Sequence, residues 1–470
     1  MHAPHLTVSS LLLLFFVLTP PSTTATRTPI SDAAFCAKQD IHQIALEGYY
    51  YGFPLNAMNY TRLLFFRTNR GIHANQMANA PNPPKPENVE IVKRELEALT
   101  SSAFLDLSKG PQLLSTKAPP RGQYFLITIF DAWDNVVYQI ASSTAKVSIF
   151  GPRSKYPLSV AEKGSKILRV PTNTAWVYGQ VMIKNDELGT ARLVQKGITL
   201  RRLAGTPSTA QEPFLENGSP AIIDYMETLR GLTFWRKFTE LACKNPPAPI
   251  DAPMMRKLAC LGIRPCHYYT PPSKEITWAV DRAASIGLQR LQEYALGPTV
   301  NGWVLANSSS MGRYKTNYKL RAAVSLQAIT APLPRYTFMA TACVDSQSNP
   351  LDGVPDSAYS ITFSPLPPAN AFWSLALYDR SGYIIDNDQK RFDVSSTSGV
   401  ELNYSNNKTS VTIYLQRDPP AGALGANWIA TPLADSFCMT LRLWAPKSVV
   451  FSKQNPWVPP PILKLAAPIK

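Results

Sequence analysis

Two groups of carboxylates have the residue types and the spacing for acid–base chemistry. Asp131 and Asp134 share the polar turn DAWDN between two apolar runs. A second group lies in or near the segment 366–393: Asp379, Asp386, Asp388 and Asp393. Two carboxylates across a cleft can divide the roles of acid and base in glycoside cleavage when their surroundings separate their pKa values. The simpler interpretation of Asp131 and Asp134 is a capped turn, since an Asp side chain accepts hydrogen bonds from nearby backbone N–H groups.

Around the second group we predict a catalytic site at three residues: Asp379, Asn387 and Arg391. Five polar or aromatic residues beside apolar strands are predicted to bind a ligand: Asn173, Trp176, Asn427, Trp428 and Arg442. Aromatic faces could stack on a sugar or another small oxygenated molecule while amide and guanidinium groups orient it. The alternative is structural, because buried Asn and Arg side chains also satisfy backbone groups at strand ends.

Signatures of metal or nucleophilic catalysis are scarce. Only His42, His73 and His267 follow the first 25 residues, and the motifs HExxH, GxSxG and GxGxxG do not occur. We therefore predict no metal site, and the sequence indicates no particular cofactor. The run 386–388 could supply oxygen ligands for calcium, although a polar turn is the simpler interpretation. Cys266 precedes His267, but a disulfide is favoured there over Cys–His catalysis.

Several features predict a secreted glycoprotein. The apolar run 11–18, followed by prolines and small residues, predicts a signal peptide over residues 1–25 and no stable membrane anchor. Five Asn-x-Ser/Thr sequons predict glycosylation: Asn59, Asn217, Asn307, Asn403 and Asn407. The six cysteines permit three disulfides in an oxidising compartment, and Cys260 and Cys266 are close enough to bridge a short loop. Buried free thiols are the alternative.

The charge balance does not indicate a nucleic-acid partner. The net charge is +15, but the 47 Lys and Arg residues are scattered along the chain. A protein that follows a phosphate backbone usually concentrates its basic residues in a stripe beside aromatic stacking platforms. A small molecule or a carbohydrate is therefore the expected partner.

The elements that must position these residues are mainly β, with a helical part. Apolar spacing predicts a helix over 31–66, interrupted at Gly52-Phe53-Pro54. Short strands are predicted in both halves of the chain: 124–130, 136–140, 174–183, 372–379, 411–416 and 437–443. In 174–183 the alternation places Trp176 and Tyr178 on one face and apolar residues on the other.

Helical periodicity returns between 219 and 327, with Ser219 and Ser273 as expected N-caps. In the strand 372–379, Phe372 and Tyr378 share one face and Trp373 lies on the other. Bulk on both faces predicts a strand within a two-layer structure. The Pro-rich end of the chain is expected to be extended.

The chain resembles a known family over most of its length after Glu47. The matching pieces in the first half are EGYYYGFPL, SSAFLDLSKGP, DAWDNVVY and LRVPTNTAWVYGQ. In the second half they are LPPANAFWSLALYD, the pair Asn387 and Arg391, NWI and LRLWAP. In this order they are similar to proteins with a domain of unknown function 1254 followed by a domain of unknown function 1214. One segment departs from the relatives: 94–100, RELEALT, stands where they typically carry a polar Asn-Asn-Asp-Thr segment and a Tyr.

The resemblance implies an immunoglobulin-like sandwich, a helical linker region and a C-terminal jelly-roll-type sandwich. The corresponding predicted regions are 31–215, 216–330 and 331–470. The resemblance implies no reaction, and a site that the polar segment serves in relatives would be altered here. Two functions stay open. The first is an enzyme that acts on a small molecule or carbohydrate, by hydrolysis or by tailoring a secreted metabolite, and the alternative is a noncatalytic extracellular glycan-binding or ligand-binding protein.

Overall fold

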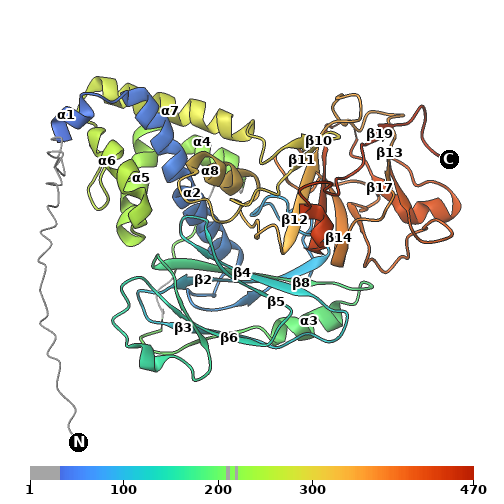
Figure 1. Ribbon diagram of the computed structural model, residues 1–470, viewed down its shortest axis with the longest axis horizontal. Helices are drawn as coiled ribbons and strands as arrows, with labels where there is room; N and C mark the ends of the chain where they lie inside the picture. Colours follow the sequence, from blue (N-terminus) through green and yellow to red (C-terminus); the bar gives the residue numbers. More distant parts are fainter. Residues whose placement is uncertain (1–31, 208–211, 217–220, 434) are drawn as a thin grey trace, which may run out of the picture. The chain divides into compact units, whose positions relative to one another are not determined.

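The computed structural model describes residues 32–470 apart from 208–211, 217–220 and 434 (Figure 1). The predicted signal peptide, the sequon at Asn217 and the expected N-cap at Ser219 lie outside the described residues. The chain divides into two units. The described part of the first unit, residues 32–39, contains α1 (Asp32–Cys36), and the second unit, residues 40–470, contains every other element.

A long helix, α2 (Ile41–Thr68), is the centre of the helical region (Figure 1). It begins at Asp40, whose Oδ1 accepts hydrogen bonds from the backbone N–H groups of His42 and Gln43. Five helices pack against it: α4 (Ile222–Thr228), α5 (Gly231–Lys244), α6 (Ala252–Cys260), α7 (Lys274–Gln292) and α8 (Tyr318–Gln327). The expected N-cap at Ser273 is confirmed, because its side chain accepts a hydrogen bond from the N–H of Ile276.

The predicted interruption of this helix at Gly52-Phe53-Pro54 is wrong, because α2 continues through Pro54. A proline inside a helix costs about 3 kcal/mol. Complete burial of Tyr51 and Phe53 offsets that cost, because α2 has core contacts on all sides. The packing is close enough that a Cβ at Gly287 of α7 would lie 2.3 Å from Cδ1 of Tyr49.

The first β-sandwich consists of two sheets that share one apolar core. The strands of one sheet, in order, are β1 (Ala78–Asn79), β2 (Ala98–Asp106), β8 (Thr174–Met182), β4 (Phe125–Asp131) and β5 (Val136–Ala141). The other sheet contains β7 (Lys166–Arg169), β6 (Ala145–Phe150), β3 (Gln112–Thr116) and β9 (Thr199–Arg202). A short turn of 3-10 helix, η1 (Leu158–Val160), and helix α3 (Leu188–Lys196) connect strands of this sandwich.

The second sandwich is built in the same way. Its larger sheet contains β10 (Thr299–Val300), β11 (Trp303–Leu305), β12 (Thr337–Ala342), β18 (Cys438–Pro446), β14 (Ala369–Tyr378) and β15 (Asp393–Ser395). Its smaller sheet contains β17 (Trp428–Ala430), β16 (Val411–Gln416), β13 (Tyr359–Phe363) and β19 (Leu463–Lys464). Three short 3-10 helices lie outside the sandwich strands: η2 (Pro249–Asp251), η3 (Gly422–Asn427) and η4 (Ser448–Phe451).

These two sandwiches confirm the expected mainly β fold with a helical part. The expectation for β14 is also confirmed: Trp373 lies in the core between the two sheets, and Phe372 and Tyr378 are buried on the other face. The region boundaries at 215 and 330 stay predictions. We note that β10 and β11, which precede residue 330, pair with the second sandwich.

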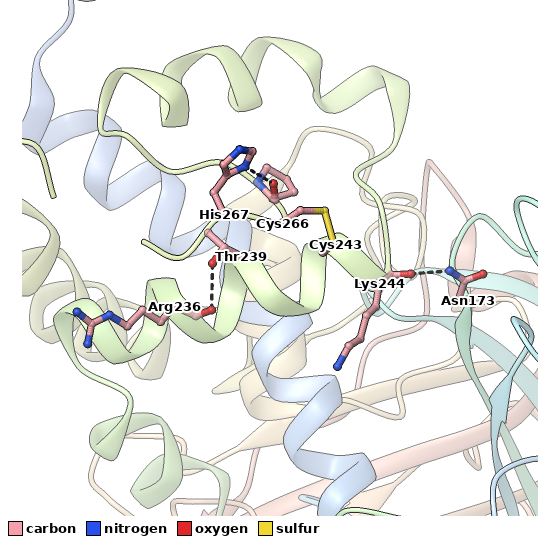
Figure 2. The surroundings of a disulfide bond; sticks show 8 residues. Asn173, Arg236, Thr239, Cys243, Lys244, Cys266 and His267 are labelled. Carbon is pink, nitrogen blue, oxygen red and sulfur yellow. Dashed lines mark hydrogen bonds between the residues drawn. A yellow bond between two sulfur atoms is a disulfide. The ribbon is translucent and has the colours of Figure 1, made fainter. Parts of the chain in front are cut away.

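None of the described cysteines is free, and one bridge differs from the sequence expectation. Cys266 bonds to Cys243 at the end of α5, not to Cys260 (Figure 2). A backbone hydrogen bond explains this pairing. The N–H of Cys266 donates to the carbonyl of Thr239 and so holds the loop against the end of α5. A second disulfide, Cys343–Cys438, lies in the second sandwich.

Candidate functional site

A cavity of about 430 Å³ lies between helix α2 and the sheet β1–β2–β8 of the first sandwich. Its walls are side chains of α2, of the segment 78–94 and of strands β2 and β8. We call it the α2 cavity. Its volume is in the range of sites for small molecules, and its lining mixes aromatic and polar side chains as such sites do.

Strand alternation explains why polar groups face this cavity. In β2, Thr100 and Ser102 line the cavity, whereas Leu99, Ala103 and Leu105 belong to the sandwich core. On the neighbouring strand, Trp176 and Tyr178 occupy the same face. The Trp176 Nε1 donates to Ser102 Oγ at 2.8 Å, and its ring stacks on Phe104. Trp176, which the sequence predicted as a ligand-binding residue, therefore forms a rigid part of the cavity wall.

An Arg–Glu pair provides charge at the cavity. Arg94 Nη1 lies 3.3 Å from Glu90 Oε2, and Nη2 donates to Thr100 Oγ1 at 3.5 Å. Thr68 of α2 donates to the other oxygen of Glu90 at 3.1 Å. Both charged side chains are mostly buried, with 13% and 19% of their surface exposed. A guanidinium and a carboxylate fixed side by side can bind hydroxyl groups as donor and acceptor.

The sequence analysis did not select Arg94 or Glu90 as site residues. Both lie at the end of a segment without strand or helix periodicity, where local pattern says nothing about tertiary position. One signal was present: Arg94 and Thr100 begin and end the segment RELEALT, where this chain departs from its relatives.

The segment 94–100 also places Glu95 in a buried cluster between the two sandwiches. Glu95 Oε2 accepts hydrogen bonds from Ser374 Oγ at 2.8 Å and from Trp444 Nε1 at 2.9 Å. Arg442 Nη1 is 3.9 Å from the same oxygen and donates to Tyr378 Oη. Arg442 was predicted to bind a ligand, and its contacts in the structure are with protein groups.

Two further carboxyl groups, Glu97 and Asp393, interact with each other beside this cluster. Burial, together with the nearby Asp393, raises the pKa of Glu97 to about 10. Burial is also the main cause that raises the pKa of Asp393 to about 7. Ser395 Oγ donates to Glu97 Oε2 at 3.0 Å. Two adjacent buried carboxyl groups cannot both ionise readily, so the pair keeps at least one proton at neutral pH.

The three predicted catalytic residues lie in turns that follow β14. Asp379 Oδ1 accepts from the N–H of Tyr383 at 2.8 Å. Asn387 and Arg391 are brought together, since Asn387 Oδ1 accepts from the N–H of Arg391. Arg391 also donates to the carbonyls of Trp428 and Ala426, at 3.0 and 2.9 Å. These contacts position backbone, and a catalytic role for the three residues stays a prediction.

The other predicted ligand-binding residues are dispersed. Asn173 donates to the carbonyl of Lys244 (Figure 2). It also lines a different cavity, of about 530 Å³, which residues at the end of α5 line as well. Asn427 bonds to both backbone groups of Asn403, and Trp428 Nε1 donates to the carbonyl of Gln416. Of the five residues, Trp176 alone lines the α2 cavity. Ligand binding by the others stays a prediction.

Asp131 caps its turn, as the simpler interpretation of the sequence predicted. Its Oδ1 accepts hydrogen bonds from the N–H groups of Trp133 and Asn135. Asp134 accepts from Ser325 Oγ of α8 at 2.7 Å. Burial raises the pKa of both carboxyl groups. The hydrogen bond between Asp134 and Ser325 therefore connects the first sandwich to α8.

Neither metal nor membrane features stand out. Among the residues that the structure describes, no three His, Cys, Asp or Glu side chains are grouped as metal ligands. In the run 386–388, Asp386 forms an ion pair with Lys390 at 2.6 Å. Within the same described part of the chain, no helix has the length and apolar character to cross a membrane.

Comparison with one solved structure agrees with this architecture. A crystal structure of a Vibrio parahaemolyticus protein matches 91% of this chain and 100% of its own, with a TM-score of 0.63 and 16% identity, which shows a shared fold. A structure of an uncharacterized Burkholderia cenocepacia protein covers 89% of this chain and 88% of its own, at 13% identity and a TM-score of 0.43.

No curated protein matches the sequence. Two family models match, protein of unknown function (DUF1254) at residues 74–202 and protein of unknown function (DUF1214) at 336–448. The chain therefore belongs to the two-domain proteins in which DUF1254 is followed by DUF1214.

Proposed function

We propose that this protein is a secreted glycoprotein that binds a small, oxygen-rich molecule, such as a carbohydrate fragment, in the α2 cavity. The observation that carries the proposal is the lining of the cavity. Arg94, Glu90 and Thr100 converge at one wall beside the aromatic rings of Phe65 and Trp176. Aromatic faces contact the apolar face of a sugar ring, while paired donors and acceptors select its hydroxyl groups.

Secretion is supported by the cysteines, none of which is free among the described residues. The sequons at Asn403 and Asn407 are exposed, and those at Asn59 and Asn307 are partly exposed. A shift in electrophoretic mobility after treatment with an N-glycosidase tests which of them carry glycans. An unchanged mobility of protein from a secreting host would contradict glycosylation.

Catalysis is the second candidate, because two carboxylates, Glu87 and Glu90, line the same cavity. One would act as acid and the other as base in hydrolysis of a glycoside or of a related bond in a secreted metabolite. Glu87 is exposed and Glu90 is mostly buried, so their surroundings differ as such a division of roles requires.

The test is a panel of mono- and oligosaccharides and small polyols, screened by calorimetry against the full chain. We expect Arg94→Ala to weaken binding of any hit at least about tenfold, which corresponds to loss of a charge-assisted hydrogen bond. Lys109→Ala is the matched control, because Lys109 lines the separate 530 Å³ cavity. Equal affinities of wild type and Arg94→Ala would refute the site.

Product analysis then separates the two candidates. Glu90→Gln should keep the shape of the cavity and remove its carboxylate. If the protein is an enzyme, product formation ceases in this variant while ligand still binds. If it is a binding protein, wild type binds the ligand and releases it unchanged. Metabolite profiling of a deletion strain gives the same distinction in the organism, because loss of an enzyme lets its substrate accumulate.

A further inference from the structure

Lys93 lies between two small cavities that are distinct from the α2 cavity. One, of about 30 Å³, is lined by Lys93 together with Gln180, Thr337 and Arg442. The other, of about 100 Å³, is lined by Lys93 and by residues that include Gln327 and Arg380. Arg380 is exposed, so the larger cavity reaches the surface there. A molecule of a few heavy atoms could enter by this route, since one water needs only about 10–15 Å³ of such volume.

The backbone of Lys93 is held on both sides. Its N–H donates to the carbonyl of Gly382 at 2.6 Å, and its own carbonyl accepts from Arg442 Nη2. The φ of Lys93 is +50°, in the left-handed region that residues other than glycine rarely adopt. Gly382 has a φ of +92°, and a Cβ there would lie 3.2 Å from Lys93 Cγ. Unusual backbone geometry that surrounding contacts enforce is a recurrent feature of functional sites.

The charged side chains that line the two cavities beside Lys93 are all positive. No Asp or Glu occurs among the described residues that line either cavity, whereas two arginines, Arg380 and Arg442, do. Among the described residues, no carboxylate acts on the pKa of the Lys93 amine. The residue is partly exposed and lines both cavities. Burial, aided by the nearby Arg442, lowers the pKa of Lys93 to about 8.

A lysine amine in these surroundings is a nucleophile near neutral pH. With a pKa of about 8, roughly a tenth of the amine is neutral at pH 7, whereas an ordinary lysine is almost entirely protonated. Desolvation and a neighbouring cation are the two means by which proteins activate a lysine toward carbonyl compounds.

We propose that Lys93 is a reactive amine that condenses with a small carbonyl compound, preferentially an oxo acid, entering through the cavity at Arg380. The neutral amine attacks the carbonyl carbon and a C–N bond forms. The C–O bond then breaks, and the oxygen leaves as water with both amine protons, so that a C=N bond joins the substrate to Lys93. The preference for an oxo acid follows from charge, because the exposed Arg380 at the larger cavity attracts the carboxylate. This site is independent of the function proposed for the α2 cavity.

The experiment is reductive trapping on the full chain at pH 7 with limiting glyoxylate and sodium cyanoborohydride. Cyanoborohydride supplies hydride to the carbon of the C=N bond, which leaves a stable carboxymethyl group on the modified lysine. Peptide mapping by mass spectrometry then gives a rate for each lysine. Lys319 is the matched control, since it is also partly exposed, lines another cavity and lies over the rings of Tyr50 and Tyr294.

We expect Lys93 to be modified at least about tenfold faster than Lys319, in line with its larger neutral fraction. Lys93→Arg keeps the charge and should abolish the fast modification, while Lys319→Arg should leave it unchanged. Modification of Lys93 no faster than Lys319 would overturn the proposal. Propanal, which has no carboxylate, should modify Lys93 more slowly than glyoxylate relative to Lys319. Equal relative rates would overturn the preference for oxo acids.

Discussion

In each sandwich, one sheet also buries the face that points away from the sandwich core. The two outer faces differ in what covers them. The outer face of β2 and β8 carries hydroxyl groups and Trp176 and leaves the α2 cavity open above them. The corresponding face of β14 and β18 is closed: Phe372 stacks on Trp444, and Glu95 accepts hydrogen bonds from that face. Polar groups beside aromatic rings are present in both regions. The first retains space for a ligand, whereas the second has its polar groups paired within the protein.

The largest expected effect tests the closed region. Glu95→Ala removes the carboxylate that faces Arg442 and leaves Ser374 Oγ and Trp444 Nε1 without their acceptor. Removing one partner of a buried pair costs about 3–5 kcal/mol. Urea denaturation should show a loss of this size, whereas Glu401→Gln, which breaks an exposed ion pair, should change the unfolding free energy little. A loss below about 1 kcal/mol for Glu95→Ala would mean that the cluster does not hold the sandwiches together.

The next effect is a pH dependence of stability that arises in the closed region. The pKa of Asp393 in the folded protein is about 7, above its ordinary value of 3.8, so the folded state holds the proton more tightly than the unfolded chain. The resulting stabilisation is complete below about pH 4 and is lost as the pH rises through about 7. Each tenfold difference in proton affinity between the folded and unfolded states contributes about 1.4 kcal/mol to it.

Asp393→Asn should therefore reduce the fall in unfolding free energy between pH 4 and pH 7, measured by urea denaturation at several pH values. Part of the fall should remain, because burial also raises the pKa of Glu97. Asp386→Asn is the control, since its exposed carboxyl has a pKa lowered by Lys390 and does not titrate in this window. Parallel curves for wild type and Asp393→Asn would show that the two carboxyl groups do not interact.

Much of the fold could be predicted because alternation along a strand is a local property. The faces of β8 and β14 were assigned correctly from period two alone, which placed Trp176 and Trp373 on their observed sides. The helix across Pro54 was missed because its stability comes from packing against helices distant in sequence. The partner of Cys266 was missed for the same reason, since a tertiary contact with Thr239 selects Cys243 over the nearer cysteine.

The candidate site was harder to predict than the fold. Its charged residues, Arg94 and Glu90, follow a proline-rich segment without periodicity, and they meet Thr68 only after α2 packs on the sheet. Conversely, Asn387 and Arg391 have the residue types of a site, but their hydrogen bonds are with backbone groups. Residue type and neighbouring aromatics do not reveal whether space for a ligand remains.

Substitutions of Arg391 and Arg94 test whether the first is structural and the second binds the ligand. Arg391→Ala removes two hydrogen bonds to carbonyl groups in the second sandwich and should lower the unfolding free energy by about 1–2 kcal/mol. It should leave ligand binding in the α2 cavity unchanged, whereas Arg94→Ala weakens binding with a smaller cost in stability. Calorimetry and urea denaturation on both variants test this. Loss of binding in Arg391→Ala with normal stability would instead support the site predicted from sequence.

The smallest expected effect concerns the wall of the α2 cavity. Thr68→Val keeps the shape of the side chain but removes the hydroxyl that donates to Glu90 Oε1. Glu90 remains held by Arg94, so its position should persist and the protein should lose about 0.5–1 kcal/mol at most. Affinity should fall only a few-fold if the ligand contacts the Arg94 side of the pair, and about tenfold if it uses the hydroxyl of Thr68 directly. Comparing Thr68→Val with Thr68→Ser, which restores the hydroxyl, shows which side of the cavity the ligand occupies.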